Sequence, residues 1–263
     1  LISNGNRKMT TPITEQALPK ILLIQAGTPP DELKAKHGDL PLWFSTAMGI
    51  DLENIQVVKV FNGEPLPEPD PNRVVVITGS WDMVTDKLMW SEETASWIRA
   101  IEADMPMFGV CYGHQLMSYA LGGEVDYNPK GREMGCLEVK LTDVGSRDVL
   151  TRHTPGRFRA HLTHMQTVTT LPKGAQSLAE SDLDKNQIIR YRAKAVSTQF
   201  HPEFIPDIAA SLISLRKETL LSEGHDPASM TNLLTDAVDA RAILQTFIST
   251  HVAQELFSKP LSK

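Results

Sequence analysis

Short apolar runs alternate along the chain with longer stretches in which apolar residues recur at helical spacing. KILLIQAG (20–27) predicts a buried first strand, and IQVVKVF (55–61) predicts a second. RVVVITGS (73–80) is nearly continuous in β-branched residues, which is typical of a strand buried on both faces of a parallel sheet. PMFGV (106–110) predicts the next strand and leads directly into a cysteine.

Helices are predicted between these strands. The segment 39–49 begins with Asp39, which is a suitable N-cap for a helix. The segment 91–104 is amphipathic and begins with Ser91, which is also a suitable N-cap. A further helix over 112–121 follows the cysteine. This alternation of strand and helix predicts an α/β fold with an open, doubly wound and mostly parallel sheet.

The pattern changes after Gly123. Shorter strands separated by turns predict a small antiparallel addition, and they are LEVKLTD, AHLTHMQTV, QIIRYR and AVSTQF. From residue 205 the periodicity is helical, over 206–222 and then over 229–257, where Asp226 and Pro227 open the second segment.

These patterns suggest one main domain with flanking segments. Residues 1–18 are expected to be an extraneous or disordered leader, with Met9 as the start of the protein, and residues 19–204 are expected to form the α/β domain. Residues 205–263 are then a helical extension. We expect its apolar faces to cover the same domain; the alternative is a homodimer or partner surface.

Composition narrows the functional classes. The 263 residues carry a formal net charge of -6 without long basic runs, which disfavours nucleic acid or an anionic membrane as partner. Cys111 and Cys136 are the two cysteines, too few for a disulfide framework, and the cytoplasm is the expected location. No apolar run approaches the roughly 20 residues of a membrane span. The sequence has no phosphate-binding GxxxxGK[ST] loop, so we expect no nucleotide-activating domain in this chain. We also expect no cofactor.

Cys111 lies between a predicted strand and a predicted helix, within the pattern Gly109-Val110-Cys111-Tyr112-Gly113. Glycines on both sides allow a sharp turn, as in a nucleophile elbow. The beginning of a helix also favours a thiolate over a thiol. A buried structural cysteine is the plainer interpretation, but the flanking glycines and the junction favour a nucleophile.

A cysteine nucleophile needs a base, and His201 is the best candidate among eight histidines. It follows the predicted strand AVSTQF, and Pro202 then fixes the turn. Glu203 lies two residues further and projects to the same side of an extended chain, where its carboxylate can accept from the imidazole. His161 and His164 could suggest a metal, but two ligands without further company are weak evidence, and no metal is expected.

The sequences GVCYGHQLMSYALGG and FHPE together resemble the triad-type, class I glutamine amidotransferases, and most of all the amidotransferase domain of GMP synthase and its stand-alone relatives. The resemblance extends over about residues 20–205. It implies a flavodoxin-like fold with Cys111 as nucleophile, His201 as acid and base, and Glu203 as third member of the triad.

Several further roles are implied by this resemblance alone. The backbone N–H of Gly79 or Ser80, together with that of Tyr112, would bind the oxyanion. Gln115 would lie near the substrate, and GREMG (131–135) would border the glutamine pocket.

Met165 and Gln166 depart from the family pattern. In close relatives this place has a Ser-His-Gly-Asp-like stretch that contacts the amino-acid end of the substrate, whereas this chain has THMQTV (163–168). The loss of a carboxylate leaves open how the substrate ammonium is held, and the donor need not be free glutamine.

Three functions therefore remain open. The first is glutaminase chemistry in a stand-alone amidotransferase, with the ammonia acceptor on a separate synthetase subunit. The second is a γ-glutamyl peptidase or hydrolase on the same scaffold. The third is a non-catalytic regulatory module, against which the intact Cys-His-Glu set argues.

Overall fold

The computed structural model describes residues 20–101, 104–253 and 256. The expected leader and Met9 lie outside these residues. Strands occur at β1 Ile21–Gln25, β2 Ile55–Lys59, β3 Val74–Ile77, β4 Met107–Val110, β5 Glu124–Tyr127, β6 Glu133–Leu141, β7 Arg157–His164, β8 Gln166–Thr170, β9 Gln176–Glu180, β10 Ile188–Arg192 and β11 Ala195–Thr198. The α-helices are α1 Asp31–His37, α2 Leu40–Met48, α3 Met89–Ala100, α4 Tyr112–Ala120, α5 Pro206–Leu215, α6 Lys217–Ser222, α7 Pro227–Asn232 and α8 Val238–His251.

Within the described residues, nine strands form one sheet in the order β2-β1-β3-β4-β11-β10-β9-β6-β7. The first five strands run parallel, and every pairing from β11 to β7 is antiparallel. β5 and β8 form a separate antiparallel pair. The predicted fold class, a mostly parallel open sheet with a small antiparallel addition, is confirmed.

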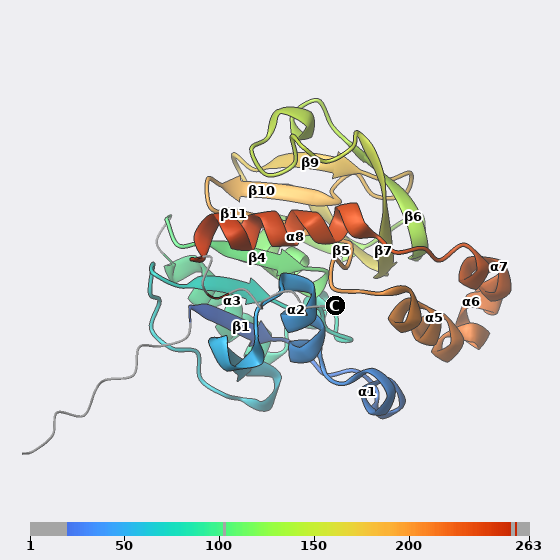
Figure 1. Cartoon of the computed structure of the whole chain (residues 1–263), viewed down its shortest axis with the longest axis horizontal. Helices are drawn as coiled ribbons and strands as arrows, with labels where there is room; N and C mark the ends of the chain where they lie inside the picture. The colour runs from blue at the N-terminus through green and yellow to red at the C-terminus, as the bar shows by residue number, and fades with distance from the viewer. Residues whose placement is uncertain (1–19, 102–103, 254–255, 257–263) are drawn as a thin grey trace, which may run out of the picture.

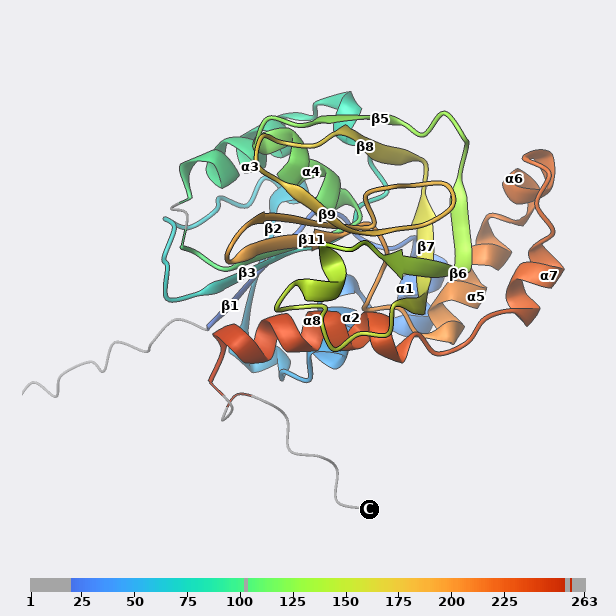
Figure 2. The ribbon, with the colours of Figure 1, turned by 90° about the horizontal axis from the view of Figure 1, so that it is seen from above.

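The central strands are buried on both faces, as their continuous apolar runs predict. In β1, Ile21 and Leu23 face a core shared with α2 and α8, whereas Leu22 and Ile24 face a second core shared with α3 and α4. Figure 2 shows α2 and α8 on one side of the sheet and α3 and α4 on the other. Strands β3, β4 and β11 are thereby fixed between two helical layers, and their carboxyl ends form a rigid edge.

The two predicted C-terminal helices are wrong in extent. The segment 206–222 is divided at Arg216 into α5 and α6, and the segment 229–257 is divided between α7 and α8. Asp226 caps α7 by accepting from the N–H groups of Ala228 and Ser229. Apolar residues keep their helical spacing between α7 and α8, so the sequence pattern does not indicate where the helix is interrupted.

The four C-terminal helices take two positions. α8 packs its apolar side into the core beside α2, through Ile243, Leu244, Phe247 and Ile248. α5, α6 and α7 instead cluster at one end of the molecule (Figure 1), where α5 and α7 contact β6. Among the described helices, none is long and apolar enough to cross a membrane.

Other boundaries also differ from prediction. α3 begins at Met89, so Ser91 is not its N-cap but a buried residue within the helix that accepts a hydrogen bond from the Tyr112 hydroxyl. Asp39 does cap α2, accepting from the Leu40 N–H. The predicted strand AHLTHMQTV is divided between β7 and β8 at Met165. α1, β5 and β9 were not predicted, since their sequences carry little apolar periodicity.

Replacement of Gly113 by alanine tests the close approach of α4 to β3. A Cβ at Gly113 would lie 2.5 Å from the Ile77 carbonyl oxygen, so the backbone would have to shift. Helix propensity alone favours alanine by about 1 kcal/mol. We nevertheless expect Gly113→Ala to lower the free energy of unfolding by about 2 kcal/mol, measured by urea denaturation.

The control is Gly156→Ala, because a Cβ at Gly156 meets nothing within 4 Å. Its unfolding free energy should stay within about 0.5 kcal/mol of the wild type. A Gly113→Ala protein as stable as this control would contradict the packing of α4 on β3.

Candidate active site

Cys111 occupies the corner between β4 and α4 with φ 51° and ψ -99°, a left-handed backbone conformation that is rare for a residue with a side chain. Its N–H donates to the Thr198 carbonyl of β11. The flanking glycines have a steric reason: a Cβ at Gly109 would lie 2.6 Å from the carbonyl oxygen of Gly113. The sequence GVCYG therefore builds a strained turn that holds a thiol above the edge of the sheet.

His201 and Glu203 follow the end of β11, the strand next to β4. The Nδ1–H of His201 donates to Glu203 Oε1 at 2.8 Å, and both side chains are buried. The imidazole also stacks on Phe204, with ring centroids 4.0 Å apart. Its orientation is thereby fixed, and Nε2 is left buried without a hydrogen-bond partner among the described residues.

The thiol and the imidazole converge beside Gly79. A Cβ placed on Gly79 would lie 3.2 Å from His201 Cε1 and 3.7 Å from Cys111 Cβ. Gly79, Cys111, His201 and Glu203 also line one cavity. Glycine at this position is thus the residue that leaves room for the two side chains to meet over the loop after β3.

The charges of the two side chains depend on each other. Burial disfavours the thiolate, but the positive charges of His201 and His164 outweigh it and lower the pKa of Cys111. Burial also disfavours the imidazolium, but the Glu203 carboxylate and the ionised thiol raise the pKa of His201 to about 10. The pair therefore favours a thiolate beside an imidazolium.

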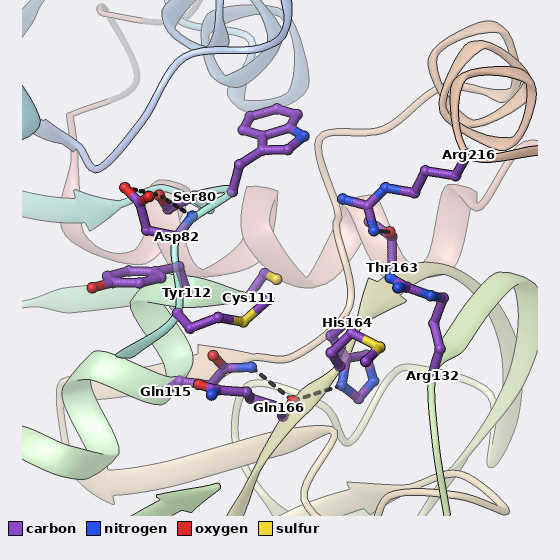
Figure 3. A pocket seen from close by; sticks show the side chains of 13 residues that line it. Ser80, Asp82, Cys111, Tyr112, Gln115, Arg132, Thr163, His164, Gln166 and Arg216 are labelled. Atoms are coloured by element: carbon purple, nitrogen blue, oxygen red, sulfur yellow. Dashed lines mark hydrogen bonds between the residues drawn. The ribbon is translucent and has the colours of Figure 1, made fainter. Parts of the chain in front are cut away.

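A second cavity adjoins the first at Cys111, and together they form one cleft. Figure 3 shows the thiol facing the centre of this second cavity. The remaining residues that the sequence predicted for the site all line it, and they are Ser80, Tyr112, Gln115, Met165 and Gln166. The structure thus brings every predicted site residue to one cleft.

Gln115 and Gln166 are tied to each other within this cleft. Gln115 Nε2 donates to the Gln166 carbonyl oxygen at 2.8 Å and to Gln199 Oε1 at 2.9 Å. The Gln166 side chain is buried and donates to Thr85 Oγ1 at 2.6 Å. Gln115 therefore holds the backbone of the segment that follows Met165.

His164 lines the second cavity and forms a buried ion pair with Glu133. His164 Nε2 lies 2.9 Å from Glu133 Oε2, its Nδ1 lies 2.9 Å from the Gln166 carbonyl oxygen, and both side chains of the pair are 1% exposed. The Glu133 carboxylate and the Gln166 carbonyl oxygen are both acceptors. Both ring nitrogens of His164 therefore donate, and the imidazole is charged. Burial opposes this charge, yet Glu133 and Asp184 raise the pKa of His164.

The two histidines that could have suggested a metal are separated by the strand. His161 and His164 lie three residues apart in β7, so their side chains project to opposite faces. Among the described residues, no three His, Cys, Asp or Glu side chains gather in a way that could hold a metal ion.

Residues 53–214 match the family model for class-I glutamine amidotransferases. The chain belongs to this family. The expected resemblance is thereby confirmed. The match includes the elbow, the His201–Glu203 pair and the residues that line the cleft, except Leu40 and Arg216.

Relatives within the family carry different names. A glutamine amidotransferase-like protein of Schizosaccharomyces pombe is 25% identical over 79% of this chain and 92% of its own length. A glutamine-hydrolyzing GMP synthase subunit of Archaeoglobus fulgidus is 42% identical, but over only 39% of this chain and 54% of its own length. Gamma-glutamyl peptidase 4 of Arabidopsis thaliana is 26% identical over 78% of this chain and 83% of its own length.

Solved structures agree on the fold. The crystal structure of a glutamine amidotransferase from Thermotoga maritima superposes with a TM-score of 0.70 over 89% of this chain and 98% of that protein, at 22% identity. At this identity the likeness concerns the fold and leaves the chemistry to the residues of the cleft.

Two arginines in the cleft were not predicted. Arg132 lies just before β6 within the GREMG segment, which was expected to border the pocket, and Arg216 lies between α5 and α6. No sequence signal marks Arg216, because it falls inside a stretch that resembles an ordinary amphipathic helix. The charged His164–Glu133 pair was also missed, since it forms only when β6 and β7 align.

The thiol pKa can be measured from the pH dependence of Cys111 alkylation by iodoacetamide, followed by mass spectrometry of the peptide. Only the thiolate reacts, so the rate should fall as pH decreases through a pKa below the ordinary thiol value. In His201→Gln the neighbouring charge is gone while burial remains, and the inflection should move to higher pH. Identical profiles in both proteins would contradict the thiolate–imidazolium pair.

Glu133→Gln tests the buried pair. Leaving the charged His164 without its carboxylate should cost about 3 kcal/mol of unfolding free energy, measured by urea denaturation near pH 6. Because the folded pKa of His164 is raised, this stabilisation is complete below the ordinary histidine pKa and is lost as pH rises through the raised value.

The matched control lies on the same strand. Glu138→Gln removes an exposed ion pair with Arg157, which should be worth less than about 1 kcal/mol. Equal losses in the two variants, or a loss at Glu133 that grows with pH, would contradict a charged His164.

Proposed function

We propose that this protein is a cysteine-dependent hydrolase that cleaves the γ-amide of glutamine to glutamate and ammonia. The observation that supports it most is the strained Cys111 elbow in one cleft with the His201–Glu203 pair. A structural cysteine would need neither a left-handed backbone nor a fixed, buried imidazole beside it. Membership of the amidotransferase family agrees with this chemistry.

The first half of the reaction forms a thioester. The thiolate of Cys111 attacks the side-chain carbonyl carbon of the donor, and the carbonyl oxygen takes the negative charge. The His201 imidazolium then gives its proton to the nitrogen as the carbon–nitrogen bond breaks, so ammonia leaves. Glu203 holds the ring on Nδ1 and stabilises its positive charge through the hydrogen bond.

Backbone N–H groups are the proposed oxyanion donors. Tyr112 is the first residue of α4, where N–H groups have no intrahelical partner, and Gly79 and Ser80 lie on the loop across the cleft. A donor of this kind typically lowers the barrier by about 3 kcal/mol. The N-terminus of α4 adds its positive dipole end on the same side.

The second half consumes water. His201, now neutral, removes a proton from a water molecule that attacks the thioester carbonyl. The carbon–sulfur bond breaks, glutamate leaves, and Cys111 returns as a thiolate beside an imidazolium. One donor and one water thereby yield glutamate and ammonia, and the process requires neither metal nor cofactor in this scheme.

The fate of the ammonia determines the partner. A GMP synthase subunit is among the relatives, which supports a synthetase acceptor on another chain; a cytoplasmic setting would suit it. A homodimer through the C-terminal helices is the other assembly expected from the sequence. The apolar side of α8 is buried in the core beside α2. Contacts between subunits would therefore involve α5, α6 and α7.

A γ-glutamyl peptidase is the second candidate. It is supported by Met165 and Gln166, where the cleft departs from the amidotransferase pattern, and by the similarity to a plant gamma-glutamyl peptidase over most of both chains. The same thioester scheme applies, with an amine or peptide as the leaving group. Nothing observed in the cleft favours a non-catalytic module.

Release of glutamate from glutamine and from a panel of γ-glutamyl peptides tests the proposal. We expect Cys111→Ala to lose more than about 1,000-fold in kcat/KM, because the nucleophile that forms the thioester is gone. Cys136→Ala is the matched control: Cys136 is also buried but contacts Thr235, and its replacement should change kcat/KM by less than about 3-fold.

The donor that is turned over separates the two candidates. Turnover of glutamine supports glutaminase chemistry, whereas turnover of γ-glutamyl peptides with glutamine inert supports the peptidase. Equal rates for the wild type and Cys111→Ala would contradict both.

A further inference from the structure

Arg216 enters the cleft from outside the α/β domain. It lies at the break between α5 and α6, and it lines both cavities that meet at Cys111. Figure 3 shows its side chain extending into the cavity from the side opposite Cys111. The break in the predicted helix 206–222 thus coincides with a residue that faces both halves of the cleft.

The two cleft arginines differ in their partners. Arg132 is neutralised by Glu223, which accepts from its Nε at 2.7 Å and from one Nη at 3.1 Å. Arg216 donates to the Thr163 hydroxyl at 3.3 Å, and among the described residues no carboxylate oxygen lies within 4 Å of its guanidinium nitrogens. Of the two, Arg216 therefore carries the positive charge that lacks an adjacent carboxylate.

The Arg216 side chain is half-buried. Burial of a guanidinium is unfavourable unless an anion binds to it and compensates its charge. Its planar set of N–H donors matches the two oxygens of a carboxylate better than any other small anionic group of an amino acid. Two further cations line the same cavity, and each already has a carboxylate: Arg132 pairs with Glu223, and His164 pairs with Glu133. The charge available for a ligand is therefore that of Arg216.

We propose that Arg216 binds a free carboxylate of the γ-glutamyl donor and selects donors that carry one. This inference rests on the proposed function, and it adds a substrate-recognition residue contributed by the C-terminal helices. The donor then lies between the Cys111 thiolate, which meets the γ-carbonyl, and Arg216, which meets the carboxylate. The carboxylate belongs either to the α-carbon of the glutamyl group or to the leaving group.

A purely structural role for Arg216 is the competing explanation. Its hydrogen bond to Thr163 could anchor the α5–α6 corner to β7 and nothing more. In that case its replacement would affect stability and all donors alike, whereas a binding role makes the effect depend on the charge of the reagent.

Alkylation of Cys111 by iodoacetate and by iodoacetamide measures this charge effect without turnover. Both reagents require the thiolate, so changes in the thiol pKa cancel in the ratio of their rates. The anionic reagent gains from a nearby guanidinium and the neutral one does not. We expect the iodoacetate to iodoacetamide ratio at Cys111 to fall about 10-fold in Arg216→Gln and to stay within about 3-fold in Arg216→Lys.

Arg157→Gln is the matched control, because Arg157 lies on the same strand as Thr163 and pairs with Glu138 at the surface. Its ratio should equal that of the wild type. An unchanged ratio in a folded Arg216→Gln protein overturns the proposal. If Arg216→Gln does not fold, a wild-type ratio that is insensitive to added salt overturns it equally, because a charge effect must be screened.

Steady-state kinetics identify the carboxylate. For γ-glutamyl peptides, Arg216→Gln should raise KM about 10-fold and lower kcat by much less. If the KM of a donor with an α-carboxamide is the same in Arg216→Gln and the wild type, the α-carboxylate is the group that Arg216 binds. If instead the KM of a donor whose leaving group has no carboxylate is the same in both proteins, the carboxylate of the leaving group is the one that Arg216 binds. A KM that Arg216→Gln raises for both donors overturns the proposal.

The two proposals can fail separately. If no donor is turned over but the alkylation ratio still depends on Arg216, the proposed hydrolysis fails and the anion site at the thiol stands. If donors are turned over and the ratio does not depend on Arg216, hydrolysis stands and the recognition role fails.

Discussion

The left-handed backbone of Cys111 is the constraint on which the site depends. A residue with a side chain in this region costs on the order of 1–3 kcal/mol, so the surrounding structure must hold it there. The N–H groups of Cys111 and Gly113 do so by donating to the carbonyls of Thr198, the last residue of β11, and Thr78, the residue after β3. Gly109 and Gly113 let the backbone approach closely enough for these bonds to form. The parallel sheet and the elbow are therefore parts of one arrangement.

Two pairs of oppositely charged side chains lie around the turn at Cys111. The thiolate of Cys111 and the imidazolium of His201 compensate each other, and Glu203 accepts from the far side of the ring. In the wall of the cleft, His164 of the His164–Glu133 pair places another positive charge near the thiol and anchors the Gln166 backbone. Apolar residues in place of a whole buried pair can give similar stability, whereas the loss of one partner leaves the other charge buried and is costly. In this site the two pairs make a thiolate compatible with a buried position.

The sequence predicted well what depends on local chemistry. The strand at 73–80, the Asp39 cap and the elbow at Cys111 follow from short runs of residues whose preferences agree with the fold. The helix predicted over 229–257 is wrong because Leu233 and Leu234 continue the apolar spacing through a break that only tertiary contacts define. Arg216 and the His164–Glu133 pair escaped prediction for a related reason. Both depend on contacts between segments that are far apart in the sequence, and a local sequence pattern does not predict such contacts.

Detection of a covalent intermediate tests the proposed chemistry most directly. The protein is mixed with a γ-glutamyl donor, quenched in acid and digested, and the cysteine peptides are examined by mass spectrometry. A thioester mechanism predicts one glutamyl group on the Cys111 peptide, removable by hydroxylamine, and none on the Cys136 peptide. Turnover without any adduct on Cys111, or an adduct on another residue, would contradict Cys111 as the nucleophile.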